Sequence, residues 1–111
     1  MTWGRVTGTV EGDSMLLETK GQKLRLSRVQ LSKLKSEALE IGINADMIKD
    51  DNEINYSLDL PRQLHVSLTE LDEKLKFQKY TFSPTGERIT RRMVKIDLWY
   101  IEDFLNFIEK F

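Results

Sequence analysis

The chain has 111 residues and a formal net charge of −1, and it contains no cysteine. This length suits one domain over residues 1–111 and leaves no room for a second. The missing cysteines exclude disulfides, thiolate nucleophiles, iron–sulfur clusters and cysteine-bound zinc, and the small net charge argues against general affinity for nucleic acid. No apolar run approaches the ~20 residues of a membrane span and no signal-like stretch follows Met1, so we expect a soluble, cytoplasmic protein.

The charges are distributed unevenly along the chain. Residues 74–96 hold seven Lys and Arg against one acidic residue, a net charge of +6, whereas residues 1–73 carry −4 and residues 97–111 carry −3. A nearly neutral protein with one strongly positive segment still produces a local positive potential. This segment is therefore the first place to look for a binding site.

The N-terminal quarter of the chain is predicted to form three antiparallel strands. Val6, Gly8 and Val10 alternate with threonines, and short β-rich runs follow at residues 15–19 and 23–26. The segments between these runs have the residues of tight turns. We therefore expect a three-stranded meander.

A helix is predicted over residues 28–41. Ser27 suits the N-cap, Gln30 completes a capping box, and apolar side chains recur at the spacing of one helical face. Gly42 is then expected to end the helix. The polar and acidic stretch that follows, residues 44–53, is predicted to be loop with at most one helical turn.

Alternating apolar and polar side chains predict two further strands, at residues 54–60 and 64–68. Residues 67–75 fit either a helix or a turn. We favour a turn followed by a strand over residues 75–83, because β-forming residues and a hairpin signal come next.

The hairpin signal is the sequence Ser83-Pro84-Thr85-Gly86-Glu87, which has proline and glycine where a short connection needs them. It fixes a register for the two strands that it joins. In that register Phe82 faces Ile89, Tyr80 faces Arg91, Phe77 faces Val94 and Leu75 faces Ile96.

Asp97 is a suitable N-cap for a final helix with a broad apolar stripe. The predicted order of elements is thus β-β-β-α-β-β-β-β-α. Such a chain is expected to be an α+β protein: a bent antiparallel sheet or a partly open small barrel, with the C-terminal helix packed on it.

The strongest candidate for a functional site is the hairpin over residues 74–96. In the predicted register its outer face carries Lys76, Tyr80, Phe82, Arg91 and Lys95. Arg88 is expected near the tip, and Arg92 beside Lys79 on the other face.

Cations attract phosphates, and aromatic rings accept bases by stacking. The hairpin therefore predicts a small non-enzymatic binding module for an anionic partner, with nucleic acid as the leading candidate and an acidic protein as the other. The ordinary alternative is a solvated strand pair whose cations pair with acidic neighbours of the same chain.

Aromatic residues near the two chain ends form a second candidate surface. Trp99, Phe107 and Phe111 belong to the predicted final helix, and Trp3 is interpreted as an anchor or an exposed contact. These residues predict a protein–protein interaction domain, such as an inhibitor or an assembly factor. Core packing is the ordinary alternative for aromatic side chains at helical spacing.

No arrangement of catalytic residues is recognisable in the sequence. His65 is the only histidine, the acidic residues of 46–53 lack the spacing of a calcium loop, and the glycines form no phosphate-binding loop. We expect no catalytic activity, no cofactor and no metal.

Overall fold

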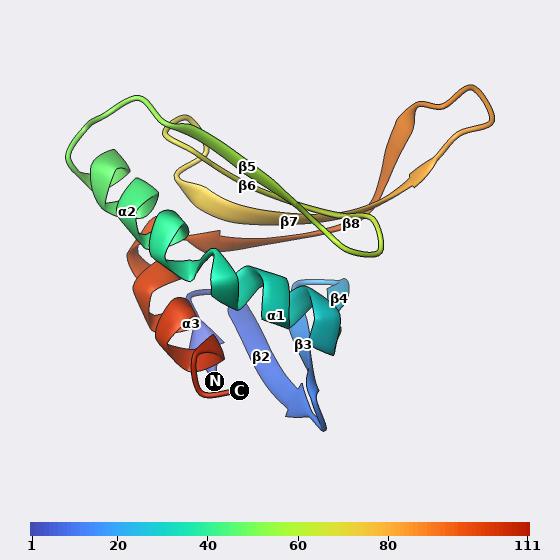
Figure 1. Cartoon of the computed structure of the whole chain (residues 1–111), viewed down its shortest axis with the longest axis horizontal. Coiled ribbons are helices and arrows are strands. Elements are labelled where there is room, and N and C mark those ends of the chain that lie inside the picture. The colour runs from blue at the N-terminus through green and yellow to red at the C-terminus, as the bar shows by residue number, and fades with distance from the viewer.

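The computed structural model describes all 111 residues and shows an α+β protein with two antiparallel sheets and three α-helices (Figure 1). The first sheet contains β1 (Thr2–Trp3), β2 (Val6–Glu11), β3 (Ser14–Thr19) and β4 (Gln22–Leu26) in that order. The second contains β5 (Asn55–Leu60), β6 (Leu64–Thr69), β7 (Lys74–Phe82) and β8 (Arg88–Asp97), also in chain order. The helices are α1 (Arg28–Ser36), α2 (Ala38–Lys49) and α3 (Ile101–Ile108), the last preceded by a short 3-10 helix, η1 (Leu98–Tyr100).

The α+β class and the C-terminal helix are confirmed. The strands, however, divide into two four-stranded sheets rather than one bent sheet, with β4 of the first sheet lying against β8 of the second. The short strand β1, which the sequence did not predict, adds Trp3 to the first sheet opposite Val6. No helix is both long enough and apolar enough to cross a membrane.

The predicted start of the first helix is confirmed, and its predicted end is wrong. Ser27 Oγ accepts a hydrogen bond from the Gln30 backbone N–H, and Gln30 Oε1 accepts one from the Ser27 N–H, which completes the capping box. The helix breaks at Glu37, and α2 then runs through Gly42 to Lys49. Burial of apolar side chains such as Ala45 and Ile48 holds this acidic stretch in a helix, so tertiary packing overrides the glycine.

Tyr56 joins the helical layer to the second sheet at this break. Its hydroxyl, at the start of β5, donates a hydrogen bond of 3.1 Å to Glu37 Oε2. Partial burial, with the nearby charge of Glu37, raises the pKa of Tyr56 to about 12. The phenol therefore remains a hydrogen-bond donor at all physiological pH values.

The ambiguous segment before β7 is a turn, as favoured. Thr69 Oγ1 accepts a hydrogen bond from the backbone N–H of Asp72, and Glu73 has a positive φ of 53° just before β7 begins at Lys74. Asp97 is an N-cap as predicted, but of the 3-10 helix η1, where its Oδ1 accepts a hydrogen bond from the Trp99 N–H; α3 itself begins at Ile101 without a side-chain cap. The β7–β8 hairpin projects beyond the body of the molecule as an arm (Figure 1).

An aromatic cluster joins the first sheet, the second sheet and α3 in the core. The ring of Trp3 packs edge-on against Phe104 at a centroid distance of 5.1 Å, and Phe104 packs against Phe77 of β7 at 5.7 Å. Trp3 is 1% exposed, so its interpretation as an exposed contact is wrong. The ring also covers the Cα of Gly8, where any side chain would collide with it.

Two glycine-to-alanine variants test this packing. In Gly8→Ala the new Cβ would lie 2.5 Å from Trp3 Cη2, and we expect overpacking to lower the free energy of unfolding by ~1–3 kcal/mol. In Gly42→Ala the Cβ would lie 3.8 Å from Leu105 Cδ1, an ordinary contact, and the helix interior should gain ~0.5–1 kcal/mol. Urea denaturation measures both effects, and a neutral Gly8→Ala would contradict the packing of Trp3.

Candidate functional site

The β7–β8 hairpin contains a β-bulge at Arg91. Leu75 pairs with Ile96 and Phe77 with Val94, as predicted, and Lys79 pairs with Arg92. Beyond Lys79 the register shifts by one residue: Tyr80 pairs with Thr90, Thr81 with Ile89 and Phe82 with Arg88. The predicted pairs Tyr80–Arg91 and Phe82–Ile89 are therefore wrong, because the connection after Phe82 is one residue longer than predicted, and the extra residue Arg91 restores the predicted register only on the far side of the bulge.

The bulge moves Arg91 to the face of the hairpin opposite Tyr80. Arg91 Nε donates a hydrogen bond of 2.9 Å to Thr81 Oγ1, whereas Gln78, on the same side as Tyr80, bonds to Thr90. The face that holds Thr81, Arg91, Lys79 and Arg92 continues the core-facing side of β7 and β8; we call it the inner face. The outer face holds Tyr80, Phe82 and Arg88.

On the outer face, Tyr80 is not available for stacking. Its side chain is buried, because the Arg88 guanidinium lies over the ring at 4.3 Å and the ring of Phe82 packs against it at a centroid distance of 5.5 Å. Phe82 itself is 52% exposed near the tip of the arm.

Arg88 is also paired with a carboxylate. It lies 3.7 Å from Asp59 Oδ2, and Asp59 accepts a 2.8 Å hydrogen bond from His65 Nδ1. The His65 hydrogen bond, helped by the charge of Arg88, holds the pKa of Asp59 below its usual value. His65 and Asp59 therefore position Arg88 over Tyr80.

The remaining cations of the outer face all form ion pairs within the chain. Asp72 lies between Lys76 and Lys95, at 3.8 and 3.3 Å from their ammonium nitrogens. Lys74 pairs with Asp97 at 3.3 Å. The predicted grouping of free cations with aromatic rings on one face is therefore wrong.

A basic cleft is present on the inner face instead, where the arm meets β4 and the β5–β6 turn. The cavity has a volume of about 330 Å³. Its lining contains five cations and no carboxylate: Lys23, Leu24, Arg25, Ser27, Gln30, Arg62, Lys79 and Arg92. The five cations repel one another at this close spacing, and an anion bound between them would relieve that repulsion. The cleft is therefore suited to binding an anion.

Backbone carbonyls fix two of these cations in place. Lys79 Nζ donates to the carbonyl of Arg62, and Arg92 Nη1 donates to the carbonyl of Lys23 at 2.9 Å. Arg92 keeps its other guanidinium donors free for a ligand. Neither residue forms an ion pair with a carboxylate, nor do Arg62 and Arg91, whereas Lys23 and Arg25 pair with Glu18 and Glu11.

The buried amide of Gln30 fixes the floor of the cleft. Gln30 is the only polar side chain among the buried residues, and its Nε2 donates a 2.8 Å hydrogen bond to the Pro61 carbonyl. This bond joins the start of α1 to the turn that carries Arg62. The N-terminus of α1 adds a partial positive charge to the same place.

Arg92 and its neighbour Lys79 lie in the basic segment that the sequence predicts to bind a partner, whereas Lys23, Arg25 and Arg62 lie outside it. These three residues are far from residues 74–96 along the chain, and only the packing of β4 and the β5–β6 turn against the arm brings them together. No local pattern indicates such a contact.

The aromatic residues predicted to bind a partner lie in different environments. Phe107 packs against Trp3 at 5.4 Å and against Phe111 at 6.1 Å, and both side chains are partly buried on the core. Trp99 alone is well exposed, at 67%, with Lys49 Nζ 5.3 Å from the centre of its ring. The four residues thus do not form one surface.

Comparison with known proteins adds no relative to this description. No protein-family model matches the chain, and neither the curated proteins nor the solved structures yield a similar protein. Within the chain itself, no group of three or more acidic or histidine side chains is placed to hold a metal ion.

Proposed function

We propose that this protein is a non-enzymatic binding module that holds the phosphates of single-stranded nucleic acid in the basic cleft. The observation that carries the proposal is the lining of the cleft, in which five cations meet and three of them, Arg62, Lys79 and Arg92, form no ion pair with a carboxylate. On a protein with a net charge of −1, such a cluster concentrates positive potential in one concave place.

The chemistry of the cleft suits phosphate. The planar guanidinium of Arg92 and the compact ammonium group of Lys79 can together bind two oxygens of one phosphate. Arg62 lies at the rim of the cleft; it is an exposed turn residue with a positive φ of 63°. All three form no ion pair within the chain, so a ligand displaces no internal carboxylate from them.

The exposed ring of Phe82 supports single-stranded rather than duplex nucleic acid. Phe82 is three residues beyond Lys79 on the extended strand β7, a separation of about 10 Å. Phe82 lies on the outer face of the arm and Lys79 on the inner face, so a chain with its phosphate in the cleft would reach Phe82 by passing around the edge of β7 beyond Lys79, where β6 no longer pairs with β7. An unpaired base there has a free face for stacking, which a paired base lacks.

An acidic peptide would also be attracted to the cleft, but it has no flat base to place on Phe82. Its binding would depend on the cations alone. A glutamate-rich peptide therefore serves as the comparison ligand in the tests below.

Two double variants with the same change in charge distinguish the inner face from the outer face. We expect Lys79→Ala with Arg92→Ala to weaken binding of a labelled oligothymidine and to reduce the slope of log K against log salt by about 1.4, since each phosphate contact contributes ~0.7. We expect Lys76→Ala with Lys95→Ala to change neither, because both lysines pair with Asp72. Fluorescence anisotropy over a range of salt concentrations measures both quantities. Equal losses in the two variants, or no binding at low salt, would contradict the proposal.

The contribution of Phe82 has its own test. Phe82→Ala should weaken oligothymidine binding by ~1–3 kcal/mol and leave binding of the glutamate-rich peptide unchanged. Leu71→Ala is the matched control, because Leu71 is an exposed apolar residue on a different turn of the same sheet. If both substitutions have the same small effect, Phe82 does not stack on a base.

A further inference from the structure

Helix α2 is apolar on two sides, and only one of them is covered. Ala38, Ile41, Ala45 and Ile48 are buried in the core. A second apolar stripe lies on the outside of the helix, where Leu39 is 75% exposed, Ile43 46% and Met47 40%. Neighbouring exposed apolar side chains of this kind are typical of an interaction surface, and no other part of the chain covers the outer stripe.

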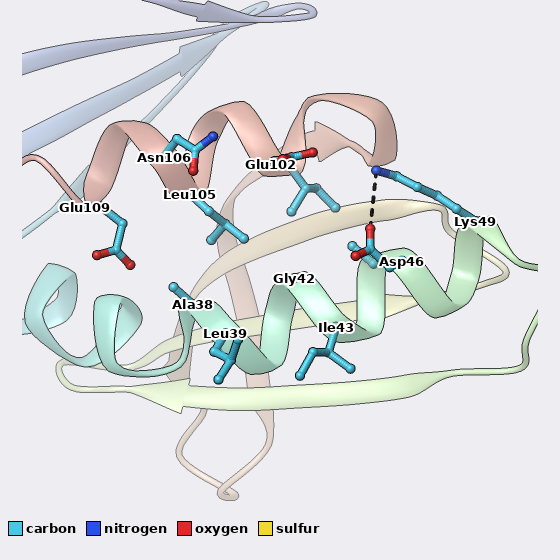
Figure 2. Close-up of a pocket in the computed structure, with 12 residues that line it drawn as sticks. Ala38, Leu39, Gly42, Ile43, Asp46, Lys49, Glu102, Leu105, Asn106 and Glu109 are labelled. Carbon is cyan, nitrogen blue, oxygen red and sulfur yellow. Dashed lines mark ion pairs between the residues drawn. The ribbon is translucent and has the colours of Figure 1, made fainter.

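A groove runs beside this stripe, between α2 and α3. It encloses a cavity of about 380 Å³, and small residues of α2, Ala38, Gly42 and Ala45, lie opposite Leu105 of α3. Figure 2 shows Leu39 and Ile43 projecting from the same side of α2, with α3 alongside. Leu39 and Ile43 line the groove from the side of α2 that faces away from α3, and Met47, which is not part of the lining, extends the apolar stripe along the helix.

The rim of the groove is acidic. Asp46, Glu102 and Glu109 line it, and the only cation among the lining residues is Lys49, which pairs with Asp46 at 3.8 Å (Figure 2). Glu102 and Glu109 form no ion pair. They are seven residues apart, about 10 Å along the axis of the helix.

We propose that the groove between α2 and α3 docks a basic amphipathic helix of a partner protein. Leu39, Ile43 and Met47 extend over eight residues, about 12 Å, which matches apolar side chains at i, i+4 and i+8 of a docked helix. Cations two turns apart on the flank of that helix would meet Glu102 and Glu109.

Charge complementarity selects this occupant over others. A second copy of the chain docking through the same face would place its own carboxylates against Glu102 and Glu109, which like-charge repulsion disfavours. An anionic membrane surface attracts helices with basic rather than acidic flanks. The acidic rim also repels nucleic acid. The groove and the basic cleft are therefore two different sites that attract ligands of opposite charge.

The test uses a labelled synthetic helix of leucine and lysine, with leucines at i, i+4 and i+8 and lysines two turns apart on one flank. We expect micromolar binding by the whole protein. A scrambled peptide of the same composition and a leucine–glutamate peptide should not bind. The variant Leu39→Ser with Ile43→Ser should weaken binding of the lysine peptide about tenfold or more, whereas Val29→Ser with Leu71→Ser, two exposed apolar residues elsewhere, should not.

Charge reversal gives the second measurement. Glu102→Lys with Glu109→Lys should abolish binding of the lysine peptide and create binding of the glutamate peptide; Asp13→Lys with Glu53→Lys, two exposed acidic residues elsewhere, should do neither. All of these side chains are exposed, and circular dichroism confirms that each variant is folded. No binding of the lysine peptide, equal binding of the scrambled peptide, or failure of the charge exchange would overturn the proposal. So would a dimer that Leu39→Ser with Ile43→Ser dissociates, or binding to phosphatidylserine vesicles.

Discussion

Strand β8 has to meet two requirements along one stretch of chain. Its second half must place Val94 and Ile96 in the core, and its first half must continue the hairpin out into solvent. The bulge at Arg91 separates these halves, because one unpaired residue exchanges the faces on which the following side chains lie. Without it, Arg91 would join Tyr80 on the outer face. With the bulge, the cations that form no ion pair lie on the inner face, between the arm and β4, and the aromatic rings of the hairpin lie on the outer face.

Opposite charges are thereby segregated on a small, nearly neutral molecule. The basic cleft is built where the two sheets meet, and the acidic groove is built between α2 and α3. Each surface includes charged side chains that form no ion pair within the chain: Arg62, Lys79 and Arg92 in the cleft, and Glu102 and Glu109 at the groove. The cations that do form ion pairs, such as Lys76 and Lys95, which share Asp72, stabilise the second sheet only modestly, since exposed ion pairs contribute ~0–1 kcal/mol.

Features set by local chemistry could be predicted from the sequence, and features set by packing could not. The capping box of Ser27 and Gln30, the turn before Lys74 and the pairing of Phe77 with Val94 depend on neighbours in the chain or on one alternating pattern. The continuation of α2 through Gly42 depends on burial against α3. The cleft is harder to predict, because Lys23 and Arg62 come close to Arg92 only when both sheets have formed. The sequence therefore indicates the basic segment but not most of the other residues that line the cleft.

The proposed function requires that anions bind at the inner face of the arm. Titration of the isotopically labelled protein with a short oligothymidine, followed through backbone amide shifts, tests this directly, because each residue reports separately. We expect the largest changes at Lys23, Arg62, Lys79 and Arg92, with Phe82 next and residues 72–76 unmoved. Changes centred on Lys76 and Lys95, or spread evenly over the surface, would contradict it.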